Sequence, residues 1–176
     1  MLSQIFGKMN SKTNYRKELE KQIYTREIHQ WIKNDKYIYR GINLLLESFT
    51  ERIAWQLLQQ KPLTFIKANG ILSCTINSPE KMNIVLIFPE LIKKLRSADP
   101  LSGVSVLAHE IGHLYYQHSN QKINTLEAQI QADNFVYQLG FGNELQDVLL
   151  DFNDDMDVKV RVSRLTTSLI GEKQDN

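Results

Sequence analysis

The pentapeptide His109-Glu110-Ile111-Gly112-His113 lies within an almost wholly apolar run, residues 104–114. On an α-helix a spacing of four places the two imidazoles on one face, about one turn apart, where a single metal ion can bind both. Glu110 is rotated by about 100° from His109, so it stands beside the metal, where a general base for metal-bound water belongs. Two histidines and a carboxylate on a buried helix are costly without a compensating ligand. The motif therefore predicts a zinc-binding helix, and histidines hydrogen-bonded to the backbone are the alternative.

Length and composition indicate a single globular domain. The chain has 176 residues, of which 42% are hydrophobic and 23% charged, and no linker or repeat divides it. We expect one domain over residues 1–176, with a helical N-terminal part at 1–60 and a core that contains the motif at 61–170.

Charge and targeting signals restrict the partners and the compartment. A formal net charge of +1 gives no basis for nucleic-acid binding, which normally requires a marked basic excess. Cys74 is the only cysteine, so no intramolecular disulfide can form. The first residues lack the pattern of a secretory signal, and no stretch approaches the roughly 18 apolar residues of a membrane span. We expect a cytoplasmic protein without a membrane span.

The residue pattern changes twice along the chain. Residues 14–60 read as two helices broken near 33–35, and the second has an apolar residue at every third or fourth position. Three short β-branched and aromatic runs follow, at 63–66, 71–76 and 84–88. The turn signals between them are Asn69-Gly70 and Asn77-Ser78-Pro79. Helices are predicted after that at 90–97, 101–118, 125–139, 144–152 and 157–169. The pattern indicates an α+β fold with a small antiparallel sheet.

A catalytic zinc site needs a third protein ligand and an open position for water. The motif with a third histidine six residues after the second is excluded, because that position is Ser119. His118 would face elsewhere on a continuous helix and is interpreted as a polar residue at the helix end. A later helix is the alternative source, and residues 127–135 of the predicted helix at 125–139 are the obvious candidate.

The segment His-Glu-Ile-Gly-His-Leu-Tyr-Tyr-Gln-His, followed by Ala132-Asp133 on an amphipathic helix, resembles the HtpX and CAAX prenyl-protease family of gluzincin metallopeptidases, especially its small soluble members. The similar part covers about residues 71–165, roughly half of the chain. The resemblance implies a zincin-like fold in which a sheet precedes the zinc helix and its edge strand holds the peptide substrate by strand addition. Residues 84–88 are the candidate for that strand.

The resemblance also shows a departure at the third ligand. The family has a glutamate three residues before the Ala-Asp pair, and Gln129 stands at that position. Glu127 is about 200° around the helix from Gln129 and cannot simply replace it. In the family the aspartate matching Asp133 orients a zinc histidine, although a carboxylate there could also bind the metal directly. The third ligand is therefore open among these three residues.

A second departure lies near the C-terminus. The family often has His-Pro some residues before an arginine that braces the site, and the histidine assists the oxyanion. Arg161 matches the arginine, whereas Asp155-Met156 replaces His-Pro. A carboxylate cannot stabilise an oxyanion, so this task would fall to zinc or to another donor. Tyrosines near the motif in sequence are candidates for that donor: Tyr115, Tyr116 and Tyr137.

Together, the motif and the resemblance predict a zinc-dependent metalloendopeptidase that acts on polypeptide substrates. His109 and His113 would bind Zn²⁺ with Gln129, or with Glu127 or Asp133 in its place. Glu110 would be the general base, and Arg161 would brace the site. The alternative is a metal-binding relative with little or no activity that serves as an interaction or scaffold module. A helical regulator with structural histidines is the third possibility.

Overall fold

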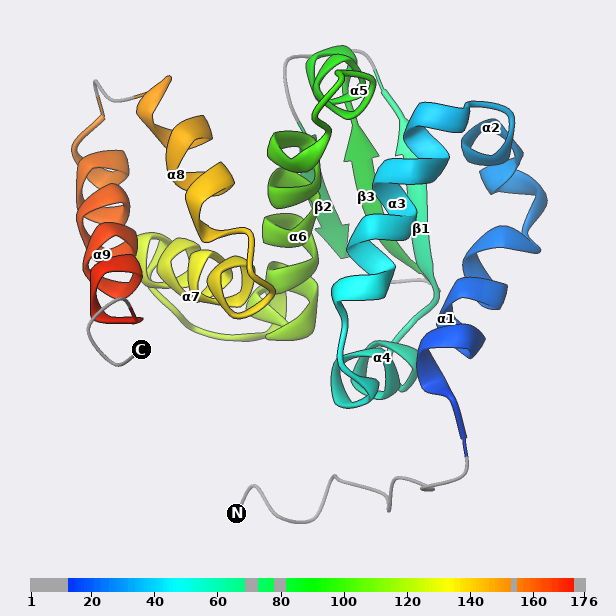
Figure 1. The fold of residues 1–176 in the computed structure, drawn as a ribbon. Helices are drawn as coiled ribbons and strands as arrows, with labels where there is room; N and C mark the ends of the chain where they lie inside the picture. Colours follow the sequence, from blue (N-terminus) through cyan, green and yellow to red (C-terminus); the bar gives the residue numbers. More distant parts are fainter. Residues whose placement is uncertain (1–12, 69–72, 78–81, 153–154, 173–176) are drawn as a thin grey trace.

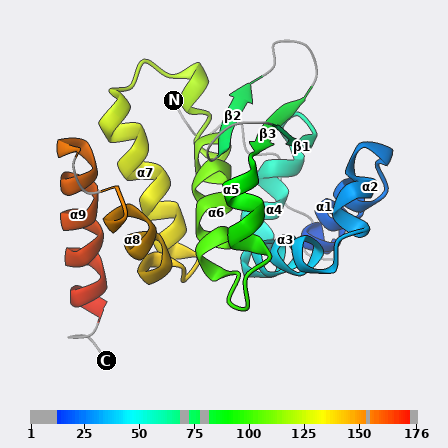
Figure 2. The same ribbon diagram turned by 90° about the horizontal axis from the view of Figure 1, so that it is seen from above.

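The computed structural model describes residues 13–68, 73–77, 82–152 and 155–172, and in it one long helix, α6, occupies the centre of the molecule (Figure 1). Helices α1 to α4 lie on one side of α6 and helices α7 to α9 on the other, as the view from above also shows (Figure 2). The helices of the N-terminal half are α1 (Tyr15–Tyr24), α2 (Gln30–Lys33), α3 (Lys36–Ser48) and α4 (Glu51–Leu58), with a 3₁₀ turn η1 at Glu27–His29.

Side-chain caps divide the N-terminal half more finely than the sequence pattern predicts. The predicted break near 33–35 is confirmed, because Asp35 accepts hydrogen bonds from the backbone N–H groups of Tyr37 and Ile38 at the start of α3. The predicted second helix is nevertheless two helices. Phe49 has an extended backbone, and Thr50 then caps α4 by accepting from Ile53 N–H. An apolar stripe alone does not show such a cap, since the three- and four-residue spacing of apolar residues continues into α4, where Ile53 and Leu57 are buried.

The sheet is mixed rather than antiparallel. Its strands are β1 (Leu63–Lys67), β2 (Ser73–Asn77) and β3 (Asn83–Ile87), in the order β1-β3-β2. β1 runs parallel to β3 with Phe65 opposite Val85, and β2 runs antiparallel to β3 with Thr75 opposite Val85. The antiparallel prediction is thus correct for one of the two pairings. Of the predicted turn residues, Asn69-Gly70 and Ser78-Pro79 lie outside the described residues.

The prediction that residues 84–88 form an edge strand is wrong. β3 is the central strand, and its backbone is hydrogen-bonded to β1 on one side and to β2 on the other. Its side chains alternate between buried and partly exposed, with Val85 and Ile87 in the core. Among the described strands, β2 is the edge strand that lies against α6 (Figure 1).

The C-terminal half agrees closely with the predicted helices. Its α-helices are α5 (Pro89–Leu95), α6 (Leu101–Tyr115), α7 (Thr125–Gln138), α8 (Gly142–Leu150) and α9 (Met156–Glu172). The α+β class is confirmed. One hydrophobic core extends from Leu19 of α1 to Leu165 of α9. No helix in the described part of the chain is both long and apolar enough to cross a membrane.

Helix α6 ends earlier than predicted, and it lies very close to α7. It stops at Tyr115, and Gln117 takes a left-handed conformation, with φ of 55°. The chain then reverses into a 3₁₀ turn, η2 (His118–Asn120). A Cβ atom on Gly112 would stand only 3.1 Å from Cα of Ala132, so the glycine inside the motif lets α7 approach α6 closely. This approach brings the polar side chains of α7 to the two motif histidines.

Candidate metal centre

Helix α6 presents His109 and His113 on the face that meets α7. Their Nε2 atoms are 3.1 Å apart, and Oε1 of Gln129 lies 2.9 Å from Nε2 of His109. Two nitrogens bound tetrahedrally to zinc at 2.0–2.1 Å would stand roughly 3.3 Å apart. The separation of the two imidazoles is therefore close to that of two ligands of one metal ion.

The other ring nitrogen of His109 faces a buried carboxylate. Nδ1 of His109 lies 2.9 Å from Oδ1 of Asp133, although this oxygen does not lie along the N–H direction. Arg161 of α9 holds the same carboxylate with two hydrogen bonds, from Nε to Oδ2 at 2.7 Å and from Nη2 to Oδ1 at 2.8 Å. Burial alone would raise the pKa of Asp133, but the hydrogen bonds and charges of Arg161 and His109 lower it below its usual value. Asp133 is thus an ionised carboxylate close to Nδ1 of His109, where its charge favours a proton on that nitrogen.

The other ring nitrogen of His113 faces a third histidine. Nδ1 of His113 lies 2.8 Å from Nδ1 of His118, and Nε2 of His118 lies 3.1 Å from Oε1 of Gln131. Gln131 in turn donates from Nε2 to Oε1 of Glu127, at 3.4 Å. The interpretation of His118 as a helix-end residue pointing elsewhere is wrong, because the helix has ended before it. Its side chain is buried against the motif.

Hydrogen-bond direction fixes the tautomers in this chain of side chains. A carbonyl oxygen only accepts, so neutral His118 carries its proton on Nε2 and offers a lone pair at Nδ1. His113 must then donate from Nδ1, which leaves the lone pair on its Nε2. Burial, together with the neighbouring His109 and His118, lowers the pKa of His113 to about 3, so this ring is neutral at neutral pH.

With its proton on Nε2, His109 donates to Oε1 of Gln129, whereas with its proton on Nδ1, facing Asp133, it belongs to a set of three neighbouring electron-pair donors. They are Nε2 of His109, Nε2 of His113 and Oε1 of Gln129. Lone pairs that face one another repel unless a cation lies between them, and imidazole nitrogens with an amide oxygen are hard-to-borderline donors that suit a divalent metal. The donor set thus fits a metal ion. Among the described residues, no three His, Cys, Asp or Glu side chains could hold a metal ion together. The set at this site contains two histidines, and its third member is the amide of Gln129.

The remaining candidates for a third ligand lie in other positions. Glu127 is exposed and is bonded to Gln131, at the outer end of the chain that begins at His113. Asp133 lies on the Nδ1 side of His109, away from the converging Nε2 atoms. Glu110, which is the predicted general base and not a candidate ligand, is partly exposed on α6. Of the three candidates, only Gln129 has an oxygen at Nε2 of His109, the ring nitrogen that faces His113.

The tyrosines proposed as oxyanion donors have other contacts. Tyr137 donates its hydroxyl hydrogen to the carbonyl of Ser168, and the ring of Tyr116 stacks on His118 with centroids 5.6 Å apart. Burial raises the pKa of Tyr116, and the neighbouring Tyr115 raises it further. The ring of Tyr115 packs against Phe135.

A cavity of about 600 Å³ opens beside the centre, between α6, α8 and α9. His109 and Arg161 lie in its wall on the side of the centre. Asp155, which stands where the resemblance places an oxyanion histidine, also lines the cavity. Most of the remaining wall is aliphatic.

A His-Glu-x-x-His helix packed on a small sheet, with donors supplied by the next helix, defines a metallopeptidase type of site. The model of peptidase family M48 matches residues 74–170, a range that includes every side chain of the candidate metal centre. The chain belongs to peptidase family M48, which confirms the resemblance, and the family is one of metallopeptidases. No curated protein and no solved structure matches the chain.

Proposed function

We propose that this protein is a zinc-dependent endopeptidase. The observation that supports the proposal best is the proximity of three possible metal ligands, since Nε2 of His109 lies 3.1 Å from Nε2 of His113 and 2.9 Å from Oε1 of Gln129. Nδ1 of each imidazole also faces a polar group, the carboxylate of Asp133 for His109 and the ring of His118 for His113, as is usual for histidines that bind a metal. Zinc bound there would polarise the scissile carbonyl and lower the pKa of its bound water.

Glu110 is the general base of the proposed reaction. It follows His109 on α6, so its side chain is rotated by about 100° from the face that carries the metal ligands. In this position the carboxylate takes a proton from the attacking water and later gives it to the leaving amine. Its side chain is partly exposed in the structure.

Asp133 and Arg161 position the ligands and do not touch the substrate in this proposal. The double hydrogen bond from Arg161 fixes the carboxylate of Asp133, whose negative charge would favour a proton on Nδ1 of His109. Arg161 therefore acts through Asp133, because its guanidinium is already engaged.

The edge strand β2 is the proposed support for the backbone of the substrate. It lies against α6, and within the described residues it is paired on one side only, with β3. A peptide in extended conformation could pair with its other side by strand addition and so lie across the zinc helix. This assignment moves the proposed substrate strand from residues 84–88 to residues 73–77.

A second function, a metal-binding module without turnover, is favoured by two side chains. Gln129 supplies a neutral amide where the family has a carboxylate, and Asp155 occupies the place of the oxyanion histidine. The first change weakens metal binding, and the second removes a donor for the transition state.

The test is to measure zinc content and the cleavage of casein with purified full-length protein. Zinc in a one-to-one ratio and cleavage that Glu110→Gln abolishes would support the peptidase, with exposed Glu90→Gln of α5 as the matched control. Stoichiometric zinc without cleavage of any of several unfolded substrates would support the binding module. Protein that takes up no zinc would contradict both functions.

A further inference from the structure

Exposed apolar side chains gather where α8 ends and α9 begins. Leu150, Phe152 and Met156 are 48%, 45% and 71% exposed, and they make up three of the seven large hydrophobic side chains exposed in the described part of the chain. We call this region, together with Asp151 and Asp155, the α8–α9 corner. Exposed apolar side chains concentrated in one short segment commonly mark a binding surface.

The corner continues into the cavity beside the candidate metal centre. Phe152 lines the mouth of the cavity, and aliphatic side chains form its walls: Val106, Leu145, Val148 and Val158. His109 and Arg161 lie in the same wall. An apolar side chain that enters from the corner would thus be buried within reach of the proposed zinc ligands.

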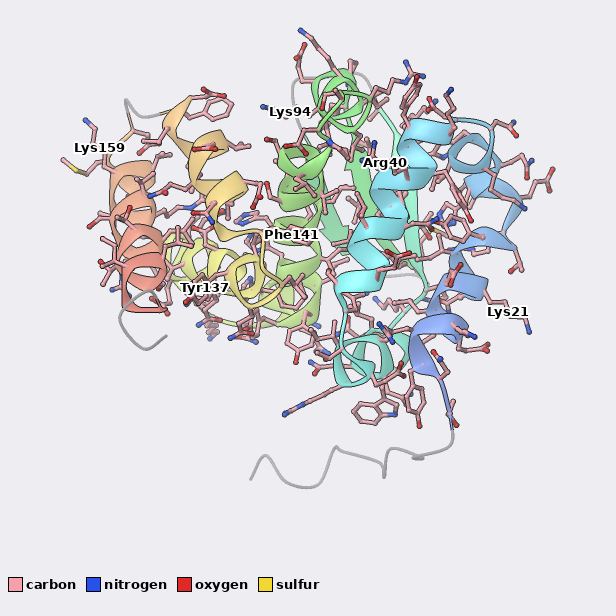
Figure 3. All side chains as sticks on the ribbon, in the orientation of Figure 1. Lys21, Arg40, Lys94, Tyr137, Phe141 and Lys159 are labelled. Carbon is pink, nitrogen blue, oxygen red and sulfur yellow. The ribbon has the colours of Figure 1, made fainter. Side chains whose placement is uncertain are left out.

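The charge around the corner is negative. Residues 142–159 contain six acidic residues and one basic residue, and Asp151 and Asp155 line the cavity. The positive charge of Arg161 is matched by Asp133. Figure 3 shows Lys94 of α5 and Lys159 of α9 on either side of the end of α8, and Lys94 lies 4.0 Å from Asp151 in an exposed contact of little strength. The carboxylates therefore leave an excess of negative charge at the mouth.

We propose that the α8–α9 corner and its cavity bind an unfolded polypeptide segment in which apolar side chains are flanked by lysine or arginine. The apolar side chains would fill the cavity and cover Phe152 and Met156, and the cations would face Asp151 and Asp155. That the bound segment is then cleaved rests on the proposed function, whereas the binding itself does not.

Binding can be measured without hydrolysis in the full-length Glu110→Gln variant. Three fluorescein-labelled peptides in a Gly-Ser context are compared by fluorescence polarisation, with central sequences Lys-Leu-Leu-Lys, Lys-Ser-Ser-Lys and Glu-Leu-Leu-Glu. We expect the first to bind about tenfold more tightly than either of the others, because only it satisfies both the apolar and the charge requirement. Equal binding of the three peptides would overturn the proposal.

Variants locate the binding surface. Phe152→Ser and Met156→Ser should each weaken binding of the Lys-Leu-Leu-Lys peptide by about three- to tenfold. The matched control is Ile170→Ser, because Ile170 is 53% exposed near the far end of α9. Asp151→Asn and Asp155→Asn should weaken binding at low salt and reduce its salt dependence, with exposed Glu20→Gln of α1 as the charge control. Corner variants that behave like Ile170→Ser would overturn the proposal.

The outcomes separate this proposal from the proposed function. If the Lys-Leu-Leu-Lys peptide binds with the stated preference but the wild-type protein cleaves nothing, binding at the α8–α9 corner is supported and the peptidase function is contradicted. If the wild-type protein cleaves all three peptides equally well, the peptidase function stands and the surface fails. Sedimentation completes the test: a dimer that Phe152→Ser dissociates and the peptide does not would assign the corner to a second copy of this chain, against the proposal.

Discussion

Nδ1 of His113 lies 2.8 Å from Nδ1 of His118, so the second histidine of the motif is oriented by a third one that follows it by five residues. The contact is possible because α6 ends at Tyr115 and Gln117 adopts a left-handed conformation, which turns His118 back onto the helix. Gln131 and Glu127 extend the contact to the surface. Partners of this kind fix the tautomer and the orientation of metal-binding histidines.

The first prediction concerns His118. His118→Phe keeps an aromatic ring but removes the acceptor of the Nδ1 proton of His113, so we expect zinc affinity to fall by about 10- to 100-fold. Competition with a chelator measures the affinity, and circular dichroism checks that the fold is retained. Gln131→Ala, which removes only the acceptor at Nε2 of His118, should lower the zinc affinity less. An unchanged zinc affinity in folded His118→Phe would show that His113 needs no such partner.

The second prediction concerns Gln129. Gln129→Glu replaces the amide oxygen with a carboxylate, which binds zinc more strongly because it adds a negative charge. We expect zinc affinity to rise by about tenfold or more, equivalent to about 1.4 kcal/mol. Gln129→Ala should lower it, and both changes can be measured by the same competition. If Gln129→Ala binds zinc like the wild type, another residue supplies the third donor.

Helix positions were the most predictable part of this fold. The helices from α5 to α9 follow from apolar periodicity with Pro89 and Gly142 at starts, because these are local signals. Strand order was not predictable in this way. β1 pairs with β3, and the order depends on which side of β3 each neighbour occupies. The prediction that residues 84–88 form an edge strand was wrong for this reason.

In the candidate site, too, contacts within one helix were predictable from the sequence and contacts between elements were not. A spacing of four on a helix is enough to predict that His109 and His113 meet, since both lie on one element. The contacts of Gln129 and Asp133 depend on how α7 crosses α6, which Gly112 and Ala132 determine through their close approach. His118 was missed because neither glycine nor asparagine marks the left-handed position at Gln117. The contact of His118 with His113 becomes evident only from the structure, in which α6 ends before His118.

The third prediction concerns the pair Arg161 and Asp133. Their side chains are only 12% and 4% exposed, so Arg161→Met would leave a buried carboxylate without its main partner. We expect a loss of about 3–5 kcal/mol in the free energy of unfolding, measured in urea. Asp133→Asn combined with Arg161→Met should cost less than the sum of the single changes, because the uncompensated charge is then gone. Additive losses would mean that the pair is not coupled.

The fourth prediction concerns His29, which joins the N-terminal helices to the sheet. Nδ1 of His29 lies 2.7 Å from the carbonyl oxygen of Ile23, and Nε2 accepts a hydrogen bond from Phe65 N–H at 3.0 Å. The ring is therefore neutral in the folded protein, with its proton on Nδ1. Burial lowers the pKa of His29, the hydrogen bond to Ile23 opposes this shift, and the charge of Arg26 adds to it.

The sign of the pH dependence follows from this lowered pKa. Below the ordinary histidine pKa of about 6.5, the unfolded chain binds a proton at His29 that the folded chain does not bind. Stability contributed by neutral His29 is complete above about pH 6.5 and is lost as the pH falls toward the folded pKa, by at most about 1.4 kcal/mol per pH unit. Urea unfolding at about pH 7 and about pH 5 measures the loss. His29→Gln should reduce the slope, and the remaining part would include His113, whose pKa is also lowered. An identical slope in the wild type and His29→Gln would contradict a neutral, buried His29, since only a group that changes its protonation on unfolding contributes to the slope.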